Sequence, residues 1–151
     1  DGITSLLSAV AAGSLPCLEV LIQAGANPNV TAGGATPLHV AADSGNLEMI
    51  KCLLQAGGDP NTSDDDGFKP IEVAALRDNL EVVEHLLPLT SPIPGVSNWT
   101  VDGIVKYASS KMEEEKVPLL NFLYPRMFMK PLYFANSVNF YICIHSTGAR
   151  K

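Results

Sequence analysis

The chain has 151 residues, of which 46% are hydrophobic and 17% charged, so it can bury a core and is not disordered in composition. Its formal net charge of −6 argues against nucleic acid as a partner, because phosphate binding requires a basic surface. The charge is unevenly placed. Residues 1–116 carry six basic and sixteen acidic side chains, a net charge of −10, whereas residues 117–151 carry four basic side chains and no acidic ones. Three widely spaced cysteines favour a reducing compartment, and we expect a cytoplasmic or nuclear location.

Three similar segments follow one another from residue 4. They read TSLLSAVAAGSLPCLEVLIQAGANPN (4–29), TPLHVAADSGNLEMIKCLLQAGGDPN (36–61) and KPIEVAALRDNLEVVEHLLPL (69–89). Gly25 aligns with Gly57 at an offset of 32, and Pro37 aligns with Pro70 at an offset of 33. A repeat of this length indicates stacked units, each built from one supersecondary motif.

Each segment is predicted to form two short helices. In the middle copy, Thr36 suits the N-cap and Pro37 the first helical position. Gly45 ends this helix, Asn46 can cap the next one, and Gly57 ends the second helix. The apolar residues of the second helix recur at helical spacing, at Leu47, Ile50, Leu53 and Leu54.

These residues resemble the ankyrin repeat, whose signature includes T-P-L-H-x-A at a period of 33. The resemblance covers residues 1–90 and implies an all-α solenoid of about three helix-turn-helix units (1–30, 31–62 and 63–90) with β-hairpin-like fingers. The copies depart from the signature in places. Leu7 replaces the histidine in the first copy, and Asp78 replaces the inter-helix glycine in the third.

His39 could be a base or a ligand, but the repeats favour a structural role. Leu7 and Glu72 occupy the equivalent positions, so no catalytic identity recurs. The resemblance implies that the His39 ring joins a hydrogen-bond network with Thr36 and a neighbouring unit. We expect His39→Leu to cost one buried hydrogen bond, about 1 kcal/mol. Glu72, at the third helical position, can reach back to its own N-cap amide.

The triplet Asp64–Asp66 before Gly67 suggests a calcium loop, but the spacing fails. An EF-hand that starts at Asp59 would need glycine sixth and glutamate twelfth, where this chain has Asp64 and Pro70. A phosphate loop, an HExxH motif, a paired-cysteine zinc spacing and a GxSxG elbow are all missing from the sequence. We therefore predict no enzyme, no metal, no cofactor and no small-molecule substrate.

The expected function is that of a non-catalytic adaptor or scaffold that binds another protein. The resemblance implies a concave groove lined by the first helix of each unit and by the finger tips. Apolar side chains at Phe68, Val73 and Leu76 suggest an exposed patch there, although Phe68 has the alternative of folding onto the next unit. The acidic charge favours a basic or amphipathic partner. The predicted partner-binding residues are Val40, Asp43, Ser44, Asp64, Asp65, Phe68, Val73, Leu76 and Arg77.

Residues 91–116 combine a proline-rich linker with an amphipathic helix. Trp99 is expected to dock on the last unit, and apolar residues from Val101 to Met112 recur at helical spacing despite Gly103. Such a helix could cover the open end of the third unit, which a solenoid needs. Together with the repeats, this segment resembles plant proteins that join an ankyrin array to a tetratricopeptide domain.

Residues 117–151 form a basic tail with seven of the ten aromatic residues of the chain. Three interpretations stay open: a non-homologous end from splicing or read-through, a segment packed on the array, or a membrane-directed segment. Residues 131–149 hold no formally charged side chain and nearly reach the length of a span, but several polar residues and Pro131 weaken that reading. The alternative function is therefore a membrane-associated ankyrin protein anchored by its tail.

Overall fold

A computed structural model of the chain describes residues 4–114, with side chains described as far as Met112. Contacts divide the chain into two units, Asp1–Glu115 and Lys116–Lys151, and the fold below is that of the first. The tail, residues 117–151, lies outside the described residues, and so its three interpretations stay open. The described helices are α1 (Ser5–Ala11), α2 (Leu15–Gln23), α3 (Pro37–Ser44), α4 (Leu47–Gln55), α5 (Pro70–Leu76), α6 (Leu80–Leu86) and α7 (Val101–Glu114).

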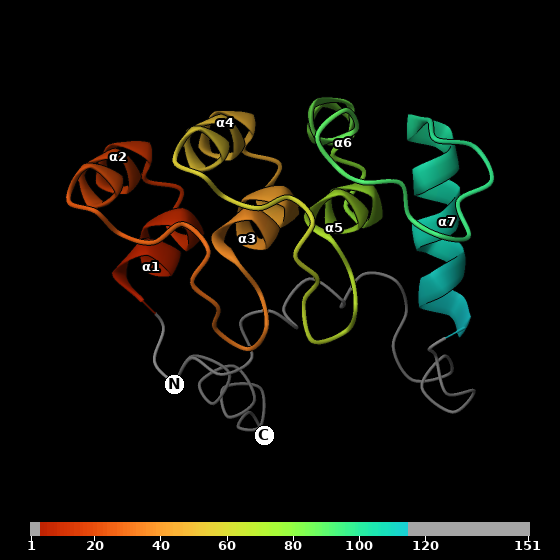
Figure 1. Ribbon diagram of the computed structural model, residues 1–151, viewed down its shortest axis with the longest axis horizontal. Helices are drawn as coiled ribbons and strands as arrows, with labels where there is room; N and C mark the ends of the chain where they lie inside the picture. Colours follow the sequence, from red (N-terminus) through yellow and green to blue (C-terminus); the bar gives the residue numbers. More distant parts are fainter. Residues whose placement is uncertain (1–3, 115–151) are drawn as a thin grey trace, which may run out of the picture. The chain divides into compact units, whose positions relative to one another are not determined.

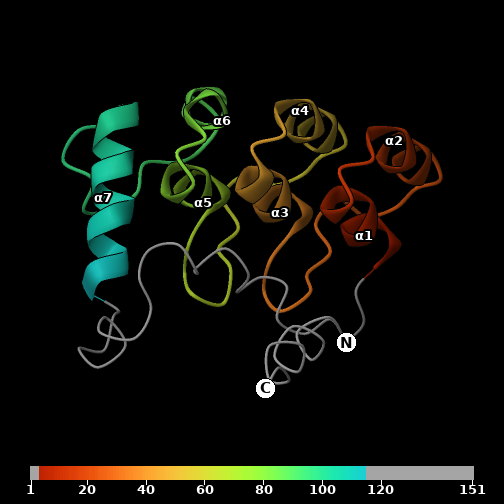
Figure 2. The ribbon, with the colours of Figure 1, turned by 180° about the vertical axis from the view of Figure 1, so that it is seen from behind.

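The first six helices form two parallel rows. Helices α1, α3 and α5 lie side by side in one row, and α2, α4 and α6 lie in the other (Figures 1 and 2). Contacts run along each row and between the two helices of each unit. The predicted all-α solenoid of three helical pairs is therefore confirmed. Below, the first row is called the inner row and the second the outer row.

The helices begin where their capping residues are placed. The side chain of Thr4 accepts a hydrogen bond from the Leu7 amide at 3.3 Å, and that of Asn46 accepts one from the Met49 amide at 3.1 Å. Thr36 has the extended backbone of an N-cap residue. The caps at Thr4 and Asn46 each satisfy a backbone donor that the first helical turn leaves unpaired, so they help to fix the starts of α1 and α4.

The core lies between the two rows. Small residues let the inner helices approach one another closely, and Ala41, Ala42 and Ala74 are all fully buried. Burying one large aliphatic side chain stabilises the fold by about 1.5–3 kcal/mol relative to leaving it exposed, so this cluster holds the rows together. The large side chains that are fully buried between the rows include Leu18, Leu38, Ile50, Leu53, Ile71 and Leu86.

The fingers are held more by asparagine side chains than by strand pairing. The strand-like pairing within the described residues is limited to an isolated bridge between Ala32 and Ala35, so the expected β-hairpins are reduced to tight turns. Asn29 donates to the Gly57 carbonyl at 2.9 Å and accepts from the Asp59 amide at 2.8 Å. Asn61, at the equivalent position, accepts from the Ser91 amide at 2.8 Å. The recurring asparagine therefore ties each connection to the next one.

Asp78 adopts the left-handed backbone that glycine adopts in the other two copies. Its φ is 61°, close to the 68° of Gly13 and the 70° of Gly45. This conformation costs an L-residue roughly 1–2 kcal/mol, and less for aspartate. The departure from the repeat signature in the third unit is thus a point of stored strain.

We expect Asp78→Gly to raise the free energy of unfolding by about 0.5–1 kcal/mol, because glycine adopts positive φ without a steric penalty. Urea denaturation measures the change. Asp78→Ala is the matched control, since it removes the carboxylate but keeps a Cβ. Equal stabilisation by both substitutions would show that charge, and not backbone strain, is responsible.

Helix α7 packs against the inner helix α5 of the third unit and also contacts α6. Ile104 and Ala108 are fully buried in this contact, as the helical spacing predicts. Trp99 docks on the last unit as expected, where its indole Nε1 donates to the Leu87 carbonyl at 3.2 Å. A Cβ at Gly103 would come within 2.0 Å of the Asn98 carbonyl, which explains a glycine inside this helix. The predicted cap of the solenoid is confirmed.

Candidate protein-interaction surface

The exposed sides of the inner helices carry the residues that the sequence assigns to a partner. Ser44 is exposed, and Val40 and Leu76 are half-buried on the same row. In α1, the equivalent positions Ser8, Ala11 and Ala12 are all exposed. We call Ser8, Ala11, Ala12, Val40, Asp43, Ser44, Leu76 and Arg77 the inner-helix surface.

An ion pair joins the second and third units at the centre of this surface. Arg77 Nε donates to Asp43 Oδ1, and the two side chains are only 22% and 24% exposed. The Asn79 side chain adds hydrogen bonds to the Ala42 carbonyl at 2.8 Å and to the Asp43 carbonyl at 3.2 Å. Because both charged groups are partly desolvated and Asn79 also ties the two units together, we expect this part of the surface to be ordered before any partner arrives.

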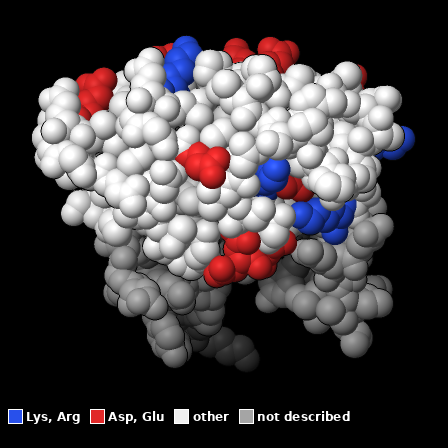
Figure 3. Space-filling view, viewed as in Figure 1, with Lys and Arg blue, Asp and Glu red and all other residues white. Residues whose placement is uncertain are grey.

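The finger that precedes α5 presents two acidic side chains to solvent. Asp65 and Asp66 are exposed, and Figure 3 shows acidic side chains at the lower edge of the described residues, over this finger. Asp64 differs from its neighbours, because it is 8% exposed and its Oδ1 accepts from the Phe68 amide at 2.8 Å and the Asp66 amide at 3.1 Å. Asp64 therefore builds the turn, and its carboxylate is buried although the sequence analysis placed it among the partner-binding residues.

Two of the predicted surface residues belong to the core instead. Phe68 is 6% exposed and Val73 is 3% exposed, and both lie in the cluster that contains Ile104 and Ala108. The expectation of an exposed apolar patch was wrong for these two residues. Helix α7 packs on α5, so the last inner helix has packed neighbours on both sides. Phe68 is buried, as the alternative of folding onto the next unit requires, but it lies against Lys111 of the cap helix and not against a further repeat.

The imidazole of His39 bridges two units, as the resemblance implied. Its Nε2 donates to the Phe68 carbonyl at 2.9 Å, which leaves Nδ1 of the neutral ring to accept from the Thr36 hydroxyl at 2.8 Å. Burial lowers the pKa of His39, while the hydrogen bond to the Phe68 carbonyl and the charges of Asp64 and Glu72 act in the opposite direction. The Thr36 amide also donates to Nδ1, at 3.1 Å, so the neutral ring is hydrogen-bonded at both nitrogens and forms a structural bridge.

Sequence comparison agrees with this geometry. The family model for ankyrin repeats, in three copies, matches residues 1–95. The chain belongs to the ankyrin-repeat family. A search of the curated proteins returned no significant match to the chain. Ankyrin repeats are protein-interaction modules and form a non-enzymatic fold, so the surface of this array is the place to look for its function.

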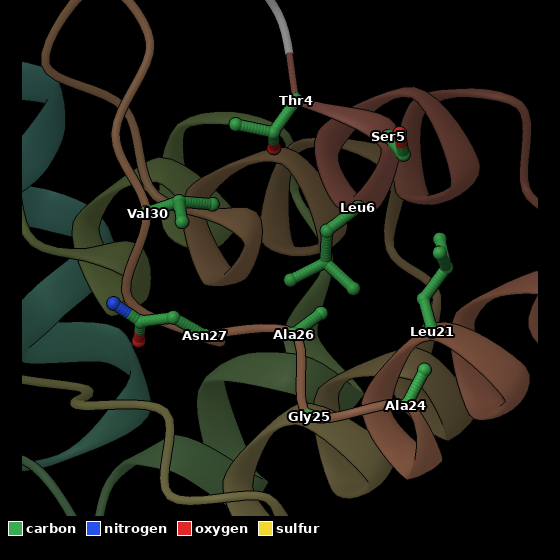
Figure 4. Close-up of a pocket in the computed structure, with 9 residues that line it drawn as sticks. All are labelled: Thr4, Ser5, Leu6, Leu21, Ala24, Gly25, Ala26, Asn27 and Val30. Atoms are coloured by element: carbon green, nitrogen blue, oxygen red, sulfur yellow. The ribbon is translucent and has the colours of Figure 1, made fainter.

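A hollow beside the first unit offers little chemistry. It measures about 410 Å³ and lies between α1, α2 and the first connection (Figure 4). Its walls include Leu6, Leu21 and Val30, and its lining contains no titratable side chain that could act as an acid or base. Within residues 4–112, no three His, Cys, Asp or Glu side chains gather in a way that could hold a metal ion.

The described helices bear on the alternative of a membrane-associated protein. None of the helices that the structure describes is long and apolar enough to span a membrane. The uncharged segment 131–149 lies outside the described residues.

Glu72 accepts from the Lys69 amide at 2.8 Å, which confirms the predicted contact with its own N-cap.

One cluster on the array escaped the sequence reasoning. Lys111 of α7 contacts Glu72 and the finger that precedes α5 (residues 64–68, the third finger), which it meets at Gly67; these residues lie 39 and 44 positions earlier in the chain. The sequence holds no local signal for such a pairing. The asparagine bridges of the fingers were detectable, since Asn29 and Asn61 recur at an offset of 32.

Proposed function

We propose that this ankyrin array is a non-catalytic adaptor that binds a basic or amphipathic protein segment through its inner-helix surface and the acidic tip at Asp65 and Asp66. The observation that carries the proposal is the Asp43–Arg77 bridge, which fixes neighbouring units relative to one another at the centre of that surface. A surface that is rigid beforehand loses little conformational entropy when it binds.

The charge and polarity of the surface indicate the kind of partner. The tip presents two carboxylates, and Val40 and Leu76 offer partly exposed apolar side chains between polar neighbours. Carboxylates at an exposed tip steer a basic segment toward the surface, and the apolar contacts then hold it. Because this attraction is screened by salt, the association rate should fall as ionic strength rises.

The test begins with peptides selected from a random library against the full chain. A surface variant would combine Val40→Ala, Leu76→Ala, Asp65→Asn and Asp66→Asn. We expect it to weaken the selected peptide by tenfold or more, about 1.4 kcal/mol or more, measured by isothermal titration calorimetry. The buried Phe68, Val73 and Asp64 are left intact so that the fold is preserved.

The matched control lies on the outer row. It would combine Leu80→Ala, Glu81→Gln and Glu84→Gln, which also remove one partly exposed leucine and two exposed carboxylates. We expect this control to change the peptide affinity by less than about twofold. Equal losses in the two variants would mean that net charge attracts the peptide, and the inner-helix assignment would then be withdrawn.

A further inference from the structure

The third finger, residues 64–68, is closed by hydrogen bonds within its own turn. The Asp64 amide donates to the Phe68 carbonyl at 2.9 Å, and the Gly67 amide donates to the Asp64 carbonyl at 3.0 Å. The Asp64 carboxylate accepts from the amides of Phe68 and Asp66, as described above. These bonds define the turn that carries the two exposed carboxylates of the proposed binding tip.

Side chains of two other elements, α3 and α7, also donate hydrogen bonds to the backbone of this turn. From the second unit, His39 donates to the Phe68 carbonyl at 2.9 Å. From the cap helix, Lys111 Nζ donates to the Gly67 carbonyl at 2.7 Å and lies 4.1 Å from the centre of the Phe68 ring. The same ammonium donates to Glu72 Oε1 at 3.3 Å, and Glu72 is 1% exposed. One lysine of α7 thus contacts the backbone of the finger, its aromatic anchor and a buried carboxylate of α5.

The finger between α2 and α3 has no counterpart of the hydrogen bond that His39 donates to the third finger. Leu7 stands in the place of His39, and a leucine side chain cannot donate a hydrogen bond to the finger. Two backbone bonds between Ala32 and Ala35, at 3.1 and 3.3 Å, close that turn. The combination of hydrogen bonds from His39 and Lys111 is therefore specific to the third finger, which lies next to the cap helix.

We propose that docking of α7 sets the conformation of the third finger through Lys111, so that the cap helix controls the acidic binding tip. The effect on a partner rests on the proposed function, whereas the coupling between α7 and the finger does not. Gly67 is exposed and its turn is short, so without the lysine the turn samples open conformations. A tip that is open part of the time binds more weakly in proportion to its closed fraction. Lys111 is a positioning residue in this scheme.

The direct test uses amide hydrogen exchange on the full chain, without a partner. Lys111→Met keeps the aliphatic stem and removes the charge and the donors. We expect the amides of Asp64, Gly67 and Phe68 to exchange about ten- to a hundredfold faster in this variant, because several charge-assisted contacts are lost. Amides of α4 should keep their protection, since α4 packs mainly on α2, α3 and α6.

Two control variants sharpen the outcome. Lys106→Met changes an exposed lysine of the same helix, and it should leave the exchange of the finger unchanged. Lys111→Arg keeps the positive charge and its donors, and it should restore most of the protection. If Lys111→Met and Lys106→Met give the same finger exchange, the coupling is refuted. If Lys111→Met unprotects all of α5 and α6 equally with the finger, Lys111 serves only general stability and the proposal is also overturned.

The effect on binding is measured with the peptide selected above. We expect Lys111→Met to weaken that peptide about three- to tenfold and Lys106→Met to leave it unchanged, since a partly open tip reduces the competent fraction. The two proposals fail in different ways. Loss of the coupling appears in the exchange of the free protein. Failure of the proposed function appears as a peptide affinity that the inner-helix variant does not change.

Discussion

Replacing Ile104 by alanine is expected to lower the free energy of unfolding by about 2–4 kcal/mol, the range for a fully buried isoleucine cut to alanine. Ile104 has no exposed surface and lies in the core cluster with Ile71 and Val73. The loss combines the transfer free energy of the removed methyl and methylene groups with a cavity between α7 and α5.

The measurement is urea denaturation, followed by circular dichroism, with hydrogen exchange on α5 and α6 as a local probe. Val105→Ala is the matched control, because Val105 neighbours Ile104 on α7 but is only half-buried. We expect this control to cost about 1 kcal/mol or less. If Ile104→Ala costs no more than its control, α7 contributes little to the stability of the array. A cap then has to be sought elsewhere in the chain.

His39→Leu is expected to cost about 2–3 kcal/mol at pH 7.5, more than the single hydrogen bond that the sequence suggests. The substitution removes the acceptor of the Thr36 amide and hydroxyl, and it leaves the Phe68 carbonyl with the Asp64 amide as its remaining donor. Thr36 is 1% exposed, and each buried polar group left unpaired costs about 1–3 kcal/mol. His85→Leu, on the half-exposed outer helix α6, is the matched control and should change stability by about 0.5 kcal/mol or less.

The same variant has a pH dependence with a definite sign. Burial lowers the pKa of His39 in the folded protein below its ordinary value of about 6.5. As the pH falls below that value, the unfolded chain takes up a proton on His39 that the folded chain does not. The stabilising effect is therefore complete above about pH 6.5 and is lost progressively as the pH falls toward the folded pKa. Below the folded pKa, this group causes no further loss.

The difference in the free energy of unfolding between the native chain and His39→Leu isolates the effect of His39 protonation. The carboxylates titrate in both proteins, so their contribution cancels in this difference. We expect the gap to be widest at pH 7.5 and to narrow toward pH 5.5, as measured by urea denaturation at both values. A gap that stays constant would show that His39 binds its proton equally well in the folded and unfolded chains, contrary to its burial.

Much of the fold could be predicted from the sequence, because its determinants are local. The offset of 32 or 33 residues defines the units, and Thr36, Pro37 and Asn46 place the helix starts where the structure has them. The role of His39 and the cap helix over Val101–Glu114 were also predicted correctly. Helix periodicity and capping depend on neighbours within a few positions, so a sequence specifies them directly.

Exposure at the end of the array could not be predicted in the same way. Phe68 and Val73 occupy positions that the repeat pattern leaves free, and they are buried in the cluster that α5 forms with α7 and its other neighbours. The Asp43–Arg77 pair and the contacts of Lys111 join residues 34 to 44 positions apart. Such contacts depend on how whole helices lie against one another.

The sequence by itself therefore determined the repeat and its helices, and its resemblance to the ankyrin repeat implied the structural role of its histidine. Only the tertiary structure decided which inner positions stay on the surface. The physical reason is that a side chain on a helix is buried by whatever packs on its outer side, and in the third unit that neighbour is a helix that follows a linker. The position and angle of α7 are fixed by long-range packing around Ile104 and Ala108, which no local pattern encodes.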